Sequence, residues 1–246
     1  MNPDARRILD HLEAVERLRS ERRSDAQLAS RVDAIKAFQS RRFQHTYADL
    51  LTSTRYAAAA RFFLDELYGS LDFCERDAQF ARVVPAMTRM LPAKLLGAVI
   101  DLAELHSMTE TMDTCMGRQL ASASTDALGY ARAWQACKQR DVRQAQIEKT
   151  LRIGKLLDKY TGNRLIRGTL RVMRGPSQAA GLGEIQRVLE SGLDAFESMR
   201  GADDFLDTIR VRETDLADTL FGTDLGKAGG RVTHLLALLP DETPKT

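Results

Sequence analysis

Apolar side chains recur at intervals of three and four residues along most of the chain, which is the spacing of one face of an α-helix. No segment shows the alternation of a half-buried strand, and no Asn-Gly pair marks a β-hairpin. This pattern predicts an all-α protein built as a bundle of about eight to ten helices. The helices are expected over residues 3–23, 24–51, 54–68, 73–84, 92–121, 125–137, 141–160, 163–174, 184–199 and 203–220.

The segment 92–121 carries the largest number of apolar positions, and they spread over more than one helical face. Such a helix is typical of the centre of a bundle, where neighbours cover several sides. We therefore expect a central apolar helix at about 92–121. The domain limits follow: a mobile, charged N-terminal helix over 1–24, a bundle domain over 25–222, and a Gly-rich segment with a flexible tail over 223–246.

Residues 61–77 predict a tight corner between two helices. Gly69 suits the end of the first helix, because glycine accepts the left-handed conformation there. Asp72 suits the start of the second, and Glu75 three residues later completes a capping box. Capping explains these three residues structurally and leaves a group of polar side chains that could line a ligand pocket. That group is Arg61, Tyr68, Arg76 and Asp77, with His106 as the floor of the pocket.

A second candidate site is the face of segment 92–121 that carries His106, Glu110 and Asp113. Their spacing places them on one side of the helix, and such a line inside a bundle could hold a metal. Helical di-metal proteins use Glu-x-x-His on two helices, however, and the chain has no Glu-x-x-His. We therefore predict no metal site and interpret His106 as the edge of the core. No histidine stands in a context diagnostic of haem, so no cofactor is specified.

Charge is segregated along the chain, although the formal net charge is only +2. Residues 138–174 contain 11 basic and 3 acidic side chains, whereas residues 184–224 contain 4 basic and 11 acidic ones. The basic part forms two helical stripes that could meet phosphates of a nucleic acid or a partner surface. The alternative, which we favour, is that the basic stripes pair with the acidic segment, within the chain or across a dimer, or are simply solvated. The stripes are Lys149, Arg152, Lys155 and Lys159, followed by Arg164, Arg167, Arg171 and Arg174.

Several classes of protein are disfavoured. No run of about 18 apolar residues marks a membrane span, and residues 1–25 lack the apolar stretch of a secretory signal. The three widely spaced cysteines, Cys74, Cys115 and Cys137, indicate reduced thiols in a cytoplasm. Nucleophile, phosphate-loop, dinucleotide and zinc-protease motifs are missing, so no residue is assigned a catalytic role and we do not expect an enzyme.

The chain resembles a family of uncharacterised helical proteins from proteobacteria over roughly residues 30–220. The phrases that carry the resemblance are TYADLL, RFFLDELYG, DFCERD, VVPAM, DLAELHSMTETMD, NRLIRGTLRVMRGPSQAAGLGEIQRVLESGLDAF and MRGADDFLDTIRVRE. The resemblance implies a bacterial cytoplasmic protein and supplies no active site.

We expect a non-enzymatic helical binding or interaction protein, regulatory in role and able to form dimers. Two alternatives stay open. One is a carrier of a small ligand, haem or metal in a bundle pocket. The other is a nucleic-acid or phosphate binder that uses the basic helix pair 149–174. The favoured partner is another protein or a second copy of the chain.

Overall fold

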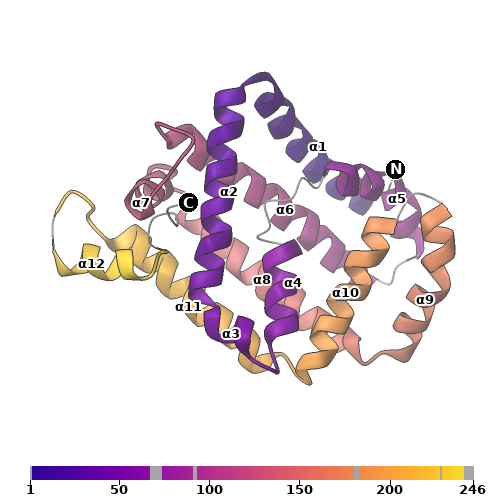
Figure 1. The fold of residues 1–246 in the computed structure, drawn as a ribbon. Coiled ribbons are helices and arrows are strands. Elements are labelled where there is room, and N and C mark those ends of the chain that lie inside the picture. Colours follow the sequence, from indigo (N-terminus) through magenta and orange to yellow (C-terminus); the bar gives the residue numbers. More distant parts are fainter. Residues whose placement is uncertain (1, 67–73, 91–92, 180–182, 228, 241–246) are drawn as a thin grey trace.

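The computed structural model describes residues 2–66, 74–90, 93–179, 183–227 and 229–240, which form twelve helices and no strand (Figure 1). This confirms the predicted all-α class, with more helices than the eight to ten expected. One cause is a break at Tyr47 that divides the expected helix 24–51. Another is a short helix at residues 230–237, inside the segment 223–246 where no helix was expected. The helices are α1 Pro3–Ser24, α2 Ala26–Thr46, α3 Ala48–Thr52, α4 Ala57–Glu66, α5 Cys74–Met90, α6 Ala93–Gln119, α7 Ala127–Ala136, α8 Arg140–Thr161, α9 Arg164–Ala179, α10 Gly183–Met199, α11 Asp203–Gly222 and α12 Gly230–Ala237.

Three predicted helix limits were wrong. The cap of α2 is Asp25 rather than Ser24, because the Asp25 carboxylate accepts hydrogen bonds from the backbone N–H groups of Gln27 and Leu28, both at 3.0 Å. Helix α5 continues through Pro85, and α9 continues through Gly175 and Pro176. A proline removes one backbone hydrogen bond. This loss does not end a helix when the turns on either side of the proline are held by packing. In α5 the neighbouring Val84 is fully buried and supplies such a hold.

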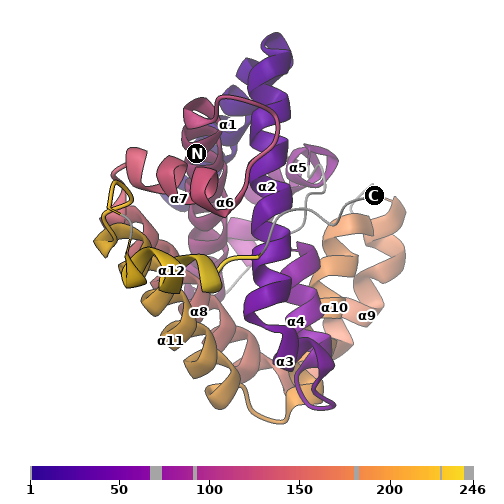
Figure 2. The ribbon, with the colours of Figure 1, turned by 60° about the vertical axis from the view of Figure 1, so that its left-hand side comes forward.

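Helix α6 packs against α1, α2, α7 and α8, and so has neighbours on several sides (Figures 1 and 2). It is not a uniformly apolar helix, however. Four of its buried side chains are polar, and two of these are carboxylates: Ser107, Glu110, Asp113 and Thr114. The expectation of a central apolar helix is therefore not confirmed, because the polar line that includes Glu110 and Asp113 is buried along with the apolar positions.

Helix α1 is packed onto the body of the protein. Ile8 and Val15 are fully buried, and Ile8 belongs to a cluster that also contains Val84 of α5 and Ile100 of α6. At the opposite end of the sequence, Leu235 of α12 is fully buried in a cluster with residues of α7 and α11. Both terminal helices thus contribute to the core.

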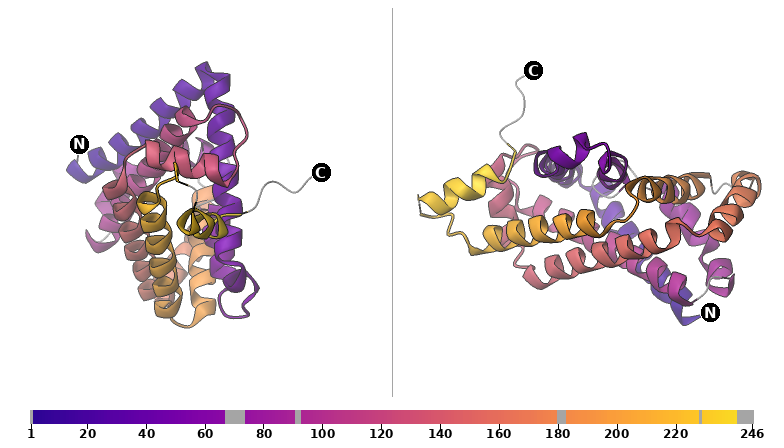
Figure 3. Two further views of the ribbon diagram at one scale, coloured as in Figure 1. Left: turned by 90° about the vertical axis from the view of Figure 1, so that its left-hand side faces the viewer. Right: turned by 90° about the horizontal axis from the view of Figure 1, so that it is seen from below.

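Helices α9 and α10 form one edge of the molecule. In Figure 1 they lie on the far side from α12, and the view from below in Figure 3 places α12 and α9 at opposite ends. Helix α10 packs against α4, α8 and α9, with Phe196 and Met199 fully buried. Among the described residues, α9 packs extensively against α10 alone. The fold therefore uses α10 as a core helix and leaves α9 as an outer layer.

Candidate functional site

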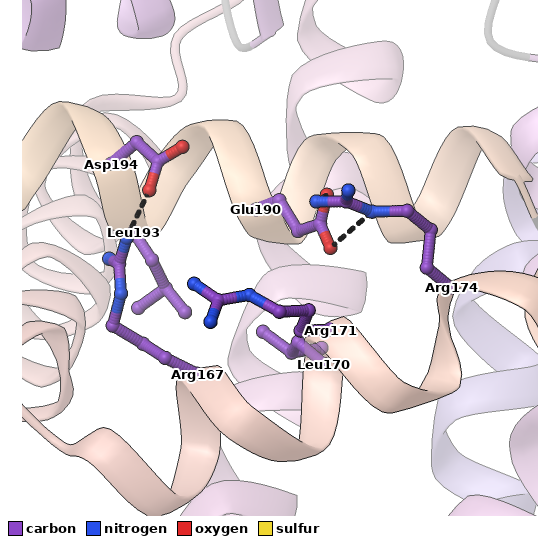
Figure 4. Close-up of a pocket in the computed structure, with 7 residues that line it drawn as sticks. All are labelled: Arg167, Leu170, Arg171, Arg174, Glu190, Leu193 and Asp194. Atoms are coloured by element: carbon purple, nitrogen blue, oxygen red, sulfur yellow. Dashed lines mark hydrogen bonds and ion pairs between the residues drawn. The ribbon is translucent and has the colours of Figure 1, made fainter.

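A cavity of about 90 Å³ lies between α9 and α10 (Figure 4). It has room for a small polar group, since about 10–15 Å³ on the same measure is enough for one water molecule. Three arginines of α9 and two carboxylates of α10 supply its charged wall, and two leucines supply its apolar part. The lining residues are Arg167, Leu170, Arg171, Arg174, Glu190, Leu193 and Asp194.

The sequence places the arginines of this cavity on one side of α9. The positions 167, 171 and 174 are separated by four and three residues, so their side chains project from the same face of the helix. Asn163 fixes the start of α9, because its side-chain oxygen accepts a hydrogen bond from the backbone N–H of Ile166 at 3.2 Å. The carboxylates Glu190 and Asp194 are one turn apart on α10 and face this row.

Two of the three arginines are paired with α10. Arg167 contacts Asp194 at 2.5 Å and Glu197 at 3.2 Å. Arg174 donates to both carboxylate oxygens of Glu190, at 3.2 and 2.8 Å. The hydrogen bond from Arg174 is the main cause of a lowered pKa of Glu190. For these two arginines the structure shows the intramolecular pairing that the acidic segment suggested.

Arg171 is the exception. Figure 4 shows its side chain extended across the cavity, between the Arg167–Asp194 and Arg174–Glu190 pairs, with no interaction drawn. Within the described residues Arg171 makes no hydrogen bond or ion pair. One η nitrogen of Arg167, Nη1, is also buried without a hydrogen-bond partner there. The cavity wall therefore contains donors that lack acceptors.

The basic stripe on α8 likewise contains side chains with and without an ion pair to a described residue. Lys149 contacts Glu104 at 2.9 Å and Asp101 at 3.5 Å, and Arg152 contacts Asp101 at 2.7 Å. Lys155 and Lys159 are exposed and form no ion pair with a described residue. Arg164, at the start of α9, is likewise exposed and outside the cavity wall. The two stripes thus do not form a continuous row of unpaired cations.

The predicted corner pocket falls partly outside the described residues. Gly69, Tyr68 and Asp72 lie in the segment 67–73, and the side chains of Glu75 and Arg76 are also outside the description. Arg61 is exposed on α4.

Asp77 and His106 are the members of the predicted corner pocket that the structure brings together. The Asp77 Oδ2 atom lies 2.7 Å from His106 Nε2 and 2.7 Å from Arg19 Nη2. Burial would raise the pKa of Asp77, but the hydrogen bond and charge of His106, together with Arg19, outweigh burial and lower it. The three side chains link α5 and α6 to α1, so this arrangement supports the fold.

Glu110 and Asp113 are both buried on α6 but differ in their partners. Glu110 accepts from Lys36 Nζ at 2.6 Å and from Arg22 Nη2 at 2.8 Å. Burial would raise its pKa, but Lys36, Arg22 and His106 outweigh burial and lower it. Asp113 accepts a hydrogen bond from a neutral donor, the amide of Gln39, at 2.9 Å. Burial raises the pKa of Asp113, and Lys36 opposes this only partly. His106, Glu110 and Asp113 therefore face protein partners, and no cluster of ligands suited to a metal ion was found in the described part of the chain.

Sequence reasoning missed the basic side chains that complete this network. Arg19 and Arg22 come from α1, and Lys36 comes from α2, far from the acidic residues in sequence. The available signal was their helical spacing: Arg19 and Arg22 are three residues apart and share one face with the apolar positions of α1. Spacing within one helix cannot say which carboxylates of another helix lie opposite.

The cysteines also correct an expectation. Cys115 of α6 and Cys137 at the end of α7 are joined by a disulfide, so they are not the free thiols predicted from their spacing. The two cysteines are 22 positions apart in the sequence, and their pairing arises because α7 folds back onto α6. The inference of a reducing compartment loses its support from these two residues.

The fold and the cavity define an all-helical protein with an arginine-lined site at one edge. A family model described as a domain of unknown function, DUF8198, matches residues 18–226. The chain belongs to this family, which confirms the resemblance to an uncharacterised family, and the cavity between α9 and α10 lies inside the matched region. Neither a curated protein nor a solved structure matches the chain. No helix in the described ranges has both the length and the apolar character needed to cross a membrane.

Proposed function

We propose that the protein is a non-enzymatic binding protein that engages a partner protein through the edge formed by α9 and α10. The observation that carries this proposal is the position of α9. The helix packs extensively only against α10 among the described residues, and Val172 at its outer side is 76% exposed. A helix in this position adds little to the core and leaves its outer face available to a partner surface.

The charges along this edge favour a protein over a nucleic acid as the partner. Binding to a nucleic acid relies on many basic side chains that meet successive phosphates. Here Glu190, Asp194 and Glu197 stand beside the arginine row and neutralise Arg167 and Arg174. A long polyanion would meet these carboxylates as well as the arginines. A protein surface with mixed charges and an apolar contact matches the edge better.

We further propose that the protein has a regulatory role in a bacterial cytoplasm and that its partner can be a second copy of the chain. The bacterial source rests on the resemblance of the sequence phrases. The location rests on the same resemblance and not on the thiols.

A photo-crosslinking experiment in the native host tests the proposal. A photoreactive amino acid is placed at Val172, and a matched variant carries it at Val211 of α11, which is 50% exposed. We expect ultraviolet light to produce a discrete crosslinked product from position 172 and not from position 211. A product of twice the chain mass would identify the partner as a second copy. Identical products from both positions, or none from position 172, would refute the proposal.

A further inference from the structure

Arg171 is the arginine of the cavity between α9 and α10 that makes no hydrogen bond or ion pair with a described residue. Three guanidinium groups and two carboxylates line the cavity, and a third carboxylate, Glu197, contacts Arg167 beside it at 3.2 Å. Arg167 and Arg174 already contact Asp194 and Glu190, so Arg171 is the guanidinium group left to bind a ligand. A guanidinium group presents several N–H donors in a fixed plane, which match the two oxygens of a carboxylate.

From this arrangement we infer that the cavity is a binding site for a carboxylate group, held by Arg171 between the two fixed arginine–carboxylate pairs. This inference rests on the proposed binding function and names the chemical group that is recognised. Glu190, Asp194 and Glu197 already stand beside the site, so a phosphate with two negative charges would be repelled more strongly than a carboxylate with one. This repulsion favours a carboxylate over a phosphate.

The remaining wall suits such a group. Leu170 and Leu193 border the cavity, and Leu193 is buried. Apolar neighbours reduce the competition of water for the arginine donors, so a charge-assisted hydrogen bond is stronger there than on an open surface. Gln186 donates to the carbonyl oxygen of Leu170 at 2.7 Å and to Glu190 at 2.8 Å. The first bond joins α10 to α9 beside the cavity, and the second orients Glu190 within α10.

The test follows the side-chain N–H signals of arginine by NMR at constant ionic strength. Sodium acetate, inorganic phosphate and the capped peptide acetyl-Gly-Glu-Gly-amide are the probes, with sodium chloride as the reference. We expect a saturable shift of the Arg171 signal with acetate and with the peptide, and a weaker effect with phosphate. Tighter binding of the peptide than of acetate would identify the source as an acidic residue of a partner. Equal binding would limit recognition to the carboxylate itself and still support the site.

Two variants make the test specific. Arg171→Gln should weaken acetate binding at least about tenfold, because it removes the charge-assisted bonds. Arg164→Gln is the matched control, since Arg164 is an exposed arginine of the same helix that does not line the cavity, and it should change the affinity less than about twofold. Both positions are exposed, and circular dichroism serves as the check that both variants fold.

The inference is overturned if acetate produces no saturable shift, if phosphate binds more tightly than acetate, or if the two variants lose the same affinity. Its failure can be told apart from failure of the proposed function. A crosslink at Val172 without acetate binding would retain the partner and reject the carboxylate site. Acetate binding without a crosslink would retain the site and reject the partner protein.

Discussion

The buried carboxylate Glu110 offers a sharp test of the network on α6. Its side chain is 4% exposed and neutralises Arg22 and Lys36, whose side chains are 12% and 18% exposed. Glu110→Gln keeps the shape of the side chain but leaves two poorly solvated cations without their counterion. Breaking a buried ion pair on one side destabilises a protein by about 3–5 kcal/mol. Because both cations retain some contact with water, we expect the lower end, about 3 kcal/mol.

Urea unfolding followed by circular dichroism measures this change, and the melting temperature should fall by about 6–12 °C in a chain of this size. The matched control is Asp10→Asn, which breaks the exposed pair between Arg6 and Asp10 in α1, where the side chains are 57% and 49% exposed. That change should alter the free energy of unfolding by less than about 0.5 kcal/mol. A loss below about 1 kcal/mol for Glu110→Gln, or equal losses in the two variants, would refute the reasoning.

The loss of stability in Glu110→Gln should depend on pH. The pKa of Glu110 in the folded protein lies below its ordinary value of 4.5. A lowered folded-state pKa contributes stability above the unfolded value, and this contribution is lost as the pH falls through the folded-state pKa. The difference in unfolding free energy between the wild type and Glu110→Gln should therefore be largest at neutral pH and shrink as the pH falls below 4.5. A difference that stays constant down to acid pH would contradict the assignment.

Three further predictions test other parts of the fold. Gly117→Ala should destabilise the protein, because a Cβ atom there would lie 2.6 Å from a methyl carbon of α2, whereas Gly97→Ala, in open space on the same helix, should stabilise it by about 0.5–1 kcal/mol in thermal unfolding. Reducing the disulfide between Cys115 and Cys137 should lower the unfolding free energy by about 2–4 kcal/mol, and alkylation of the unreduced, denatured protein should label one thiol per chain; three labels would refute the disulfide. Burial raises the pKa of Asp113, so its contribution to stability declines as the pH rises above 3.8. Asp113→Asn should accordingly leave the free energy of unfolding at pH 7 unchanged or raise it, as measured by urea unfolding. A decrease of more than about 1 kcal/mol would show that the Asp113 carboxyl group stabilises the fold at this pH.

Features that depend on neighbours in the sequence were predicted well. The helical period identified the all-α class, and the helix starts expected at 125 and 163 agree with α7 and α9, which begin beside the capping residues Asp126 and Asn163. Local signals failed where packing overrode them, as at Pro85, which α5 incorporates. The end of a helix therefore depends on the packing of its last turns as well as on residues, such as proline, that disfavour the helical conformation.

The candidate sites show the same division. The arginine row of α9 was visible in the sequence, because its spacing within one helix is a local property. That Arg171 has no partner among the described residues was not visible, because this depends on which carboxylates of α10 meet each arginine. The sequence analysis grouped Asp77 and His106 in one predicted pocket, but it did not include Arg19, which also contacts Asp77.

Periodicity, capping and charge segregation thus establish that the chain is helical, where most helices begin, and that basic and acidic segments complement one another. They do not establish how the helices cross, and crossing determines every long-range contact. The pairing of Cys115 with Cys137, the burial of Glu110 between Arg22 and Lys36, and the cavity beside Arg171 all arise from residues on different helices. The physical reason is that a helix presents a whole face to its neighbour, so its sequence defines which residues share that face and its packing defines what they meet.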